Sequence, residues 1–367
     1  MIPASAYTGV YYNILLTIVL ITAFWFRYAN NDRILIFFCR WFGWLFLLFV
    51  VLYMGMRPIS HVYFGDMGNY ARDFQSAQIS GKLMSYGLKE WFFTKYIFYC
   101  SLYMNVNSWF LLTTALYVGL AALAFRIVHK DYAYVAFLMY VASFSFWSYG
   151  TNGIRNGLAV AVALLGMACR ERKWLMASLF FLAPTIHRST LIPVAAFVMT
   201  IFFKRPRFYL LGYVLAIILS VTMGGWWQVF FVKTGLFSED ARFIQYLTKP
   251  AQEGVFSRIG FRWDFLLYSL WPIVTGWYYL VKKRFQDPFY TQLFNAYIAA
   301  NAFWILVIRA NYSNRIAFLS WFMMSWVIIY PLLKEKLFVR QNAVIARTLV
   351  AYFAFTYFMF MIKRGSF

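Results

Sequence analysis

The stretch that decides the fold is TNGIRNGLAVAVALLGMAC, residues 151–169, in which Arg155 is the only charged residue. Moving an arginine to the centre of a lipid bilayer costs roughly 2.5–3.5 kcal/mol on insertion scales, so such a residue usually faces a water-filled cavity or an anionic partner. The stretch therefore predicts a membrane helix, and Arg155 is the first candidate for a functional residue.

The whole chain has the composition of an integral membrane protein. Of its 367 residues, 63% are hydrophobic and 13% are charged, whereas soluble domains carry about 25% charged residues. The formal net charge of +22 comes from short basic clusters between apolar segments, as the positive-inside rule requires. We therefore expect an all-α polytopic membrane protein that binds no nucleic acid, because no soluble domain is left to bind it.

The apolar segments predict about twelve transmembrane helices in a single transmembrane domain that covers residues 1–367. They run approximately over residues 8–26, 34–54, 108–128, 133–150, 154–169, 174–186, 187–203, 208–223, 264–281, 289–308, 316–333 and 344–362. No internal repeat or low-complexity run divides the chain.

Short basic connectors join these segments and fall on one side of the membrane if the segments alternate. They are Arg27/Arg33, Arg126/Lys130, Arg170/Arg172/Lys173, Lys204/Arg205/Arg207, Lys282/Lys283/Arg284 and Lys334/Lys336/Arg340. We expect that side to be cytoplasmic and the N-terminus to lie outside. Two longer loops, approximately 55–107 and 224–263, then lie on the outer face, and residues 91–106 predict an interfacial or re-entrant helix.

The first outer loop offers a carboxylate in a glycine-flanked turn, Gly65-Asp66-Met67-Gly68. Asp66 at this position could act as a general base on a sugar hydroxyl. The alternative is structural: Asp66 forms an Asx-turn or pairs with Arg57 or Arg72. The spacing alone does not choose between the two.

Arg155 lies one turn into its predicted helix, close to Asn152 and Asn156. A planar guanidinium can bind two phosphate oxygens at once, which lysine cannot do. The alternative is that Arg155 extends to the outer membrane surface, because it is near the start of its helix.

The segments 174–186 and 187–203 are each short for a membrane crossing, so the turn APTIHRS between them is expected below the membrane surface. Irregular backbone at that depth is tolerated only against protein or a water-filled cavity. His187 in this turn suits proton transfer near neutral pH, and Arg188 suits a second anionic group. The alternative for His187 is a core histidine bonded to a backbone carbonyl.

A third polar turn, RANYSNR at residues 309–315, contains Arg309, Tyr312 and Arg315. Two arginines across a tight turn suit a pyrophosphate, whose charges need distributed donors. The alternative is a solvated turn whose arginines reach lipid phosphates.

The sequence holds no Walker loop, no dinucleotide-binding glycine pattern and no zinc-ligand spacing. Cys39, Cys100 and Cys169 lie apart in apolar segments and predict no disulfide framework. Carboxylates are few in the outer loops, which argues against a metal site built from them. We therefore expect no metal and no cofactor.

Four short motifs resemble those of the EpsG-type Wzy family of bacterial polysaccharide polymerases. MRPISHVYFGDMGNY (56–70) is similar to the family's arginine followed by Gly-x-Asp-x-x-x-Tyr, and GIRNGLAVAVALL (153–165) to its Ile-Arg-Gln-Gly-Leu-Ala helix. IHRSTLIP (186–193) resembles its His-Lys-Ser-Ala turn, and Asn314-Arg315 its late Asn-Arg. Asn156 and Arg188 depart from the family's usual glutamine and lysine.

The resemblance implies a bacterial inner-membrane glycosyltransferase, a helical bundle related to GT-C glycosyltransferases, that polymerises the O-antigen of lipopolysaccharide or a related glycan. Such an enzyme transfers an oligosaccharide from undecaprenyl pyrophosphate to the non-reducing-end sugar of another lipid-linked unit, on the periplasmic side and without metal. The implied partners are undecaprenyl-pyrophosphate-linked oligosaccharide, membrane lipid and a chain-length regulator protein. The expected catalytic residues are Asp66, Arg155 and His187, and the expected substrate-binding residues are Arg57, Tyr70, Asn152, Arg188, Arg309, Tyr312 and Arg315.

Direct attack of the acceptor hydroxyl would invert the anomeric centre. Two other functions stay open: a GT-C transferase that uses a sugar on a lipid monophosphate, and a transporter or flippase of lipid-linked sugars. The first needs fewer arginines than the sequence offers. Inverted repeats or paired broken helices would favour a transporter or flippase, and the sequence shows neither. A membrane acyltransferase is a further alternative, but it needs a cytoplasmic entrance, whereas the polar residues cluster in outer loops.

Overall fold

The computed structural model describes residues 2–29, 31–82, 90–233, 260–311 and 313–365, and these ranges contain helices but no strand. Six helical stretches are long and apolar enough to cross a membrane: Ala4–Tyr28, Asp32–Gly55, Val106–Val141, Pro206–Trp227, Ser313–Lys334 and Gln341–Ile362. Shorter apolar helices are Ile154–Ala168, Lys173–Ile186 and Arg188–Phe202. The prediction of an all-α polytopic membrane protein is confirmed, whereas twelve spans and a GT-C-like bundle stay predictions.

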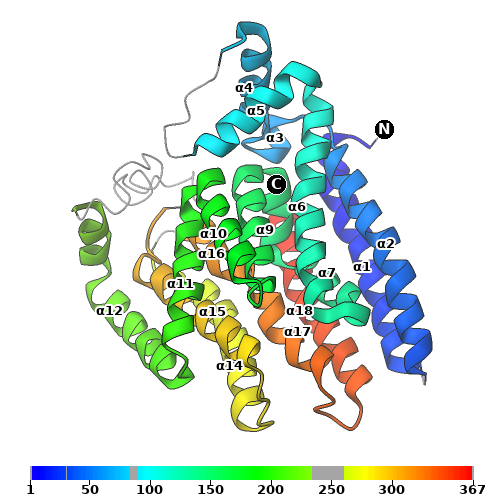
Figure 1. Cartoon of the computed structure of the whole chain (residues 1–367), viewed down its shortest axis with the longest axis vertical. Coiled ribbons are helices and arrows are strands. Elements are labelled where there is room, and N and C mark those ends of the chain that lie inside the picture. Colours follow the sequence, from blue (N-terminus) through cyan, green and yellow to red (C-terminus); the bar gives the residue numbers. More distant parts are fainter. Residues whose placement is uncertain (1, 30, 83–89, 234–259, 312, 366–367) are drawn as a thin grey trace. The chain divides into compact units, whose positions relative to one another are not determined.

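The described chain forms two compact units (Figure 1). Unit 1 comprises Met1–Leu191 and Ile329–Phe367, and unit 2 comprises Ile192–Ile328. The single transmembrane domain over residues 1–367 stays a prediction.

The helix that carries Arg155, α9 (Ile154–Ala168), is almost entirely enclosed by unit 1. Each of its residues except Asn156 is buried, and it packs against α6 (Val106–His129) and α10 (Lys173–Ile186). Small and branched apolar residues cover all sides of α9, and a helix that is apolar all round is stable only when it is surrounded.

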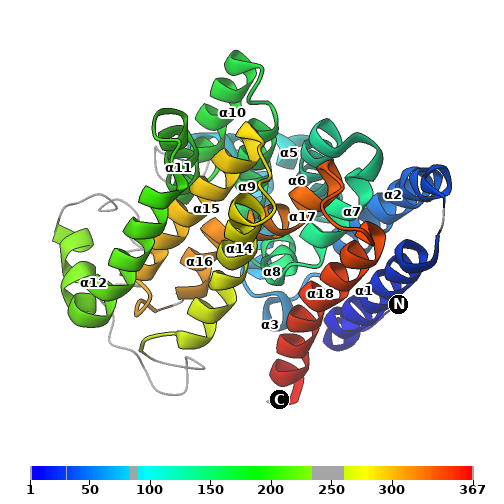
Figure 2. The ribbon, with the colours of Figure 1, turned by 90° about the horizontal axis from the view of Figure 1, so that it is seen from below.

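The outer helices of unit 1 leave wide apolar surfaces exposed. α1 (Ala4–Tyr28) packs along α18 (Gln341–Gly365), and α2 (Asp32–Gly55) packs on α6 (Figure 2). Phe37 and Trp41 of α2 are each more than half exposed. These surfaces are what lipid-facing helices require.

Two predicted spans are broken in the structure. The segment 133–150 forms α7 (Ala133–Val141) and α8 (Phe144–Thr151), separated at Ser143, which has extended backbone angles and precedes α8 as its cap. The Ser143 side chain makes no capping hydrogen bond to α8. The segment 316–333 is likewise divided into α16 (Ser313–Trp321) and α17 (Met324–Lys334).

The described residues of the first predicted outer loop form three helices. These are α3 (His61–Phe64), α4 (Met67–Ser80) and α5 (Trp91–Tyr103). The helix expected over residues 91–106 is therefore present as α5, which packs against α4 and α10. Its position at a membrane interface stays a prediction.

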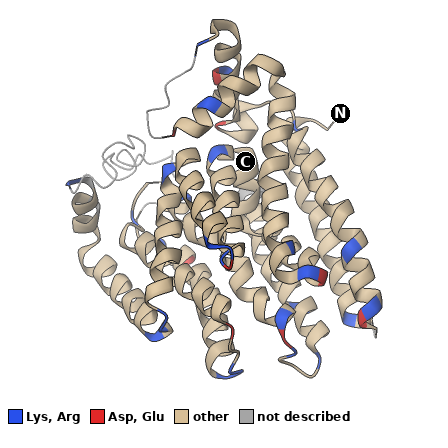
Figure 3. Cartoon of the chain, in the orientation of Figure 1, with Lys and Arg blue, Asp and Glu red and all other residues tan. Residues whose placement is uncertain are grey.

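Two of the basic connectors, Arg126/Lys130 and Lys334/Lys336/Arg340, meet at one end of unit 1, and Figure 3 shows the Lys and Arg positions in blue. Arg40 of α2 pairs with Asp131 after α6 at 2.7 Å, and Lys334 Nζ donates to the Val128 carbonyl at 2.6 Å. At the opposite end of the same helices, Arg57 lies over the ring of Phe110, near the start of α6. The connectors and the first outer loop are thus at opposite ends of unit 1.

Unit 2 is built around α15 (Pro288–Leu306), which packs against α12 (Pro206–Lys233), α14 (Trp263–Val281) and α16. α12 has a kink at Met223, where the predicted span ends, and continues to Lys233, so the first residues of the predicted outer loop are helical. The bounds of that loop stay a prediction. Most of the predicted loop, residues 234–259, lies outside the described residues.

Candidate functional site

The candidate site begins where α8 turns into α9. The backbone N–H groups of Asn152 and Gly153 both donate to the Ser148 carbonyl, at 3.0 and 2.9 Å, which ends α8. α9 then begins at Ile154, so Arg155 occupies its first turn. This short link places Asn152 and Arg155 at the end of unit 1 that carries the first predicted outer loop.

The Arg155 guanidinium is buried and ion-paired. Its Nη1 lies 2.6 Å from Glu90 Oε2, and the two side chains are 8% and 13% exposed. The guanidinium carbon also lies 6.0 Å from the centre of the Phe93 ring. The side chain therefore points into protein, and the sequence-based alternative of an arginine that extends to the surface does not describe it.

Glu90 connects α9 to the turn after α10. This residue immediately precedes α5. Its Oε1 accepts a hydrogen bond from the backbone N–H of Arg188 at 3.1 Å and lies 4.0 Å from His187 Nδ1. One carboxylate thus contacts the two predicted site segments around Arg155 and His187.

The sequence interpretation missed Glu90. The chain has 12 acidic residues against 34 basic ones, and a buried arginine needs a compensating partner. The few outer-loop carboxylates could therefore have been tested one by one as partners of Arg155. Nothing in the local sequence indicates which of them it contacts, because Glu90 and Arg155 are 65 positions apart in the chain.

His187 ends α10 with extended backbone angles. Its Nδ1 accepts the Ser189 backbone N–H at 3.3 Å and lies 2.8 Å from Ser189 Oγ. An imidazole nitrogen that accepts carries no proton, so neutral His187 has its proton on Nε2. This tautomer presents a hydrogen-bond donor at Nε2, which suits a phosphate oxygen.

Asp66 is fixed by the start of α9. Its backbone N–H donates to Asn152 Oδ1 at 2.8 Å. The preceding Gly65 has φ +56°, and a Cβ there would lie 2.5 Å from the same Asn152 oxygen. The turn therefore needs glycine, both for its left-handed backbone and for its close approach to Asn152.

The Asp66 side chain does not cap α4. Its Oδ1 accepts from Asn69 Nδ2 at 3.2 Å, and Asn69 Oδ1 in turn accepts from Arg72. In the same helix, Tyr70 is buried with its ring 6.0 Å from Phe93, the ring beside Arg155. The predicted residues Asp66 and Tyr70 thus belong to the same end of unit 1 as Arg155.

Arg57 contacts the ends of two helices. Its Nη1 donates to the Met54 carbonyl in the last turn of α2, and its Nη2 to the Thr151 carbonyl at the end of α8, at 3.4 Å. The side chain is buried. Burial lowers the pKa of Arg57 to about 9, so the guanidinium is still charged at neutral pH.

The remaining predicted residues belong to unit 2. Arg309 is exposed, donates to the Val221 carbonyl at 3.4 Å and lies over the Phe261 ring. Arg315 is in the first turn of α16. Tyr312 lies outside the described residues. A role of these residues in binding pyrophosphate stays a prediction.

Among the residues that the structure describes, no group of three or more His, Cys, Asp or Glu side chains is arranged to hold a metal ion. In the unit 1 cluster, the Glu90 carboxylate pairs with the Arg155 guanidinium and also accepts the backbone N–H of Arg188. Such a cluster can bind an anion through guanidinium donors and the His187 ring.

A sequence model of the EpsG family matches residues 44–366, which include the whole unit 1 cluster and the RANYSNR turn. The chain matches no curated protein. It matches no solved structure.

Proposed function

The chain belongs to the EpsG family of membrane polysaccharide polymerases, and we propose that it joins lipid-linked oligosaccharide repeat units into a bacterial surface glycan. The donor is an oligosaccharide on undecaprenyl pyrophosphate, and the acceptor is the non-reducing-end hydroxyl of a second lipid-linked unit. The observation that carries the proposal is the buried Arg155–Glu90 pair beside His187 and Arg188. We place the reaction at the periplasmic face of the inner membrane.

In the proposed reaction, the acceptor oxygen attacks the anomeric carbon of the donor and forms the new glycosidic bond. The bond from that carbon to the pyrophosphate oxygen breaks, and the electron pair leaves with undecaprenyl pyrophosphate. The anomeric centre is inverted. Negative charge grows on the leaving oxygen, and fixed cationic donors stabilise it in the transition state. Arg155 and Arg188 supply such donors, and the Nε2–H of His187 supplies a neutral one.

The acceptor proton must go to a base. We assign this role to Asp66, whose backbone is anchored on Asn152 and whose carboxylate accepts from the amide of Asn69. Glu90 is already bound to Arg155 and to the Arg188 N–H. We therefore assign Glu90 a positioning role, in which it fixes the direction of the Arg155 guanidinium.

The experiment is turnover of the purified protein in lipid vesicles with undecaprenyl-pyrophosphate oligosaccharide, with and without a chelator. We expect glycan longer than one repeat unit under both conditions. The rate of glycan formation should be at least about 100-fold lower with Arg155→Gln, because this variant loses one fixed donor that stabilises the transition state. Arg172→Gln, an exposed arginine between α9 and α10, is the matched control and should polymerise normally.

Three outcomes would overturn the proposal. One is transfer only from a lipid-monophosphate sugar, which would indicate a single-sugar transferase. Another is movement of the lipid-linked unit across the vesicle membrane without bond formation. The third is normal chain length with Arg155→Gln. A chain-length regulator as partner is a separate proposal, tested by adding candidate regulators to the same reaction.

A further inference from the structure

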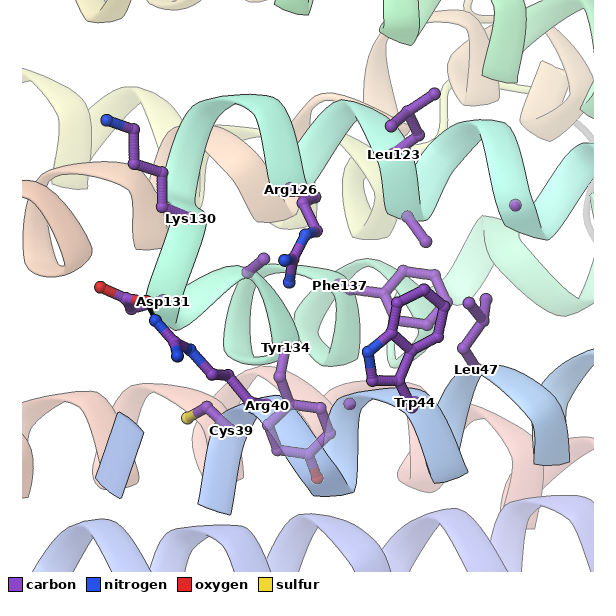
Figure 4. A pocket seen from close by; sticks show the side chains of 14 residues that line it. Cys39, Arg40, Trp44, Leu47, Leu123, Arg126, Lys130, Asp131, Tyr134 and Phe137 are labelled. Carbon is purple, nitrogen blue, oxygen red and sulfur yellow. Dashed lines mark hydrogen bonds and ion pairs between the residues drawn. The ribbon is translucent and has the colours of Figure 1, made fainter. Parts of the chain in front are cut away.

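A pocket of about 210 Å³ lies at the basic end of unit 1, between α2, α6 and α7 (Figure 4). It is far along these helices from the Arg155 cluster, since Arg40 and Asp131 border it whereas Arg57 marks the opposite end of α2. The proposed polymerase reaction does not use it. Its lining changes from charged to apolar along the helix axes.

The charged end of the pocket has an excess of positive charge. Arg40, Arg126 and Lys130 line it together with one carboxylate, Asp131. That carboxylate is bound to Arg40 at 2.7 Å. Arg126 extends from α6 toward the space between α6 and α2, whereas Lys130 points away from it (Figure 4). Arg126 is therefore the cation best placed for an anion in the pocket.

The other end of the pocket is apolar. Its lining includes Trp44, Leu47, Leu123 and Phe137. Arg40 and Leu47 are seven positions apart on α2, which corresponds to about 10 Å along the helix. This distance exceeds the depth of the headgroup region on one side of a bilayer, roughly 5–8 Å, so a pocket of this length that starts at the membrane surface extends into the hydrocarbon region.

The surface around the pocket is of the kind that faces lipid. Trp44 is 62% exposed, and the neighbouring Trp41, Leu45 and Leu48 on α2 are each more than half exposed. The same helix is long and apolar enough to cross a membrane. An occupant that enters from this side is therefore a membrane component.

We propose that this pocket binds an anionic phospholipid. Its phosphodiester contacts the Arg126 guanidinium, and the first part of an acyl chain lies against Trp44 and Leu123. Basic pockets between transmembrane helices at the membrane surface recognise acidic lipid headgroups in this way. The site requires only that α2 and α6 cross the membrane, so it does not depend on the polymerase function.

Two variants separate the headgroup contact from the chain contact. Arg126→Gln removes the charge but leaves the apolar part unchanged. Gly119 also lines the pocket, and a Cβ added there would meet nothing within 4 Å. Gly119→Leu therefore has room for its Cβ, places an apolar side chain at the pocket lining and removes no charge.

The experiment is native mass spectrometry of the full chain in detergent, titrated with phosphatidylglycerol or phosphatidylcholine. We expect preferential retention of phosphatidylglycerol and about fivefold weaker binding with Arg126→Gln, the contribution of one basic residue near a membrane surface. Gly119→Leu should weaken it to a similar extent. The matched controls are Arg172→Gln and Gly212→Leu, the latter at another open helical glycine, and both should bind as the unmodified chain does.

Equal retention of both lipids, or equal binding by all variants, would overturn the proposal. A second arm adds inorganic phosphate at millimolar concentration. If phosphate displaces phosphatidylglycerol and Gly119→Leu has no effect, the pocket is a phosphate site and not a lipid site. Melting temperatures of the variants, measured without added lipid, show whether each is folded.

Discussion

Arg155 is held by Glu90, the carboxylate that immediately precedes α5. A buried ion pair contributes little net stability, because desolvation of both charges offsets their attraction. Removing one partner is different, since it leaves a buried charge without compensation and costs about 3–5 kcal/mol. The pair therefore allows its structural and functional roles to be separated by experiment.

We expect Glu90→Gln to lower the melting temperature of the purified protein and to abolish polymerisation. The double variant Glu90→Gln/Arg155→Gln should regain much of the lost stability, because no buried charge is left, but should stay inactive. Thermal unfolding and glycan length on gels measure the two effects. Glu171→Gln, which breaks an exposed pair with Arg170, is the control and should change neither. An active double variant would show that the pair is only structural.

Asp66→Asn should reduce polymerisation by about 100-fold, within the range for loss of a general base. The melting temperature should hardly change, because the contact to Asn152 uses the backbone N–H of Asp66. The measurement is the initial rate of chain growth beside thermal unfolding. Asp32→Asn, at the start of α2, is the control. A normal rate with Asp66→Asn would contradict the assignment of Asp66 as base.

At the scale of helices, Gly65 and Gly81 provide a matched comparison. Both have positive φ, +56° and +61°, but a Cβ at Gly81 would meet nothing within 4 Å. Alanine should cost about 1–2 kcal/mol of backbone strain at Gly81, which is in the left-handed α conformation, and at least as much at Gly65, whose ψ of −116° lies outside it. Only Gly65→Ala should also displace Asn152 and Asp66, and so reduce polymerisation. Equal activity of the two variants would show that this turn does not position the site.

The positions of the helices could largely be predicted from sequence, because long apolar segments bounded by basic connectors have few other interpretations. The positions at which a helix breaks or kinks could not be predicted. Ser143 separates two helices within one apolar segment, and Met223 forms a kink within α12, which continues to Lys233. Hydropathy does not distinguish these positions from their neighbours.

Individual residues of the candidate site could be predicted from the sequence. Arg155, His187 and Asp66 each stand out as polar residues beside apolar segments, and the structure brings their segments to the same end of unit 1. Glu90 was not predictable, because its role depends on where α5 packs. The binding role of Arg309 and Arg315 in unit 2 stays a prediction.

For the whole molecule, we predict that the basic connectors face the cytoplasm and the N-terminus faces outward. In a variant that lacks the three native cysteines, Ile2→Cys should react with a membrane-impermeant maleimide added to intact cells. Arg172→Cys should react only after the inner membrane is opened. Arg40 and Lys334 mark the same end of unit 1, so cysteines near them should behave like Arg172→Cys. The reverse labelling pattern would show that the topology is inverted and that the Arg155 cluster lies on the cytoplasmic side.

The surroundings of Arg57 reduce the electrostatic attraction that its charge can exert on a distant substrate. Its charge faces the carbonyl ends of α2 and α8, which carry about half a negative charge each, while Glu90 cancels Arg155. These groups therefore create only a weak field outside unit 1, and phosphate recognition depends on close hydrogen-bond geometry. The KM for the lipid-linked donor should consequently change little with ionic strength, in contrast to sites that collect their ligands by electrostatic steering.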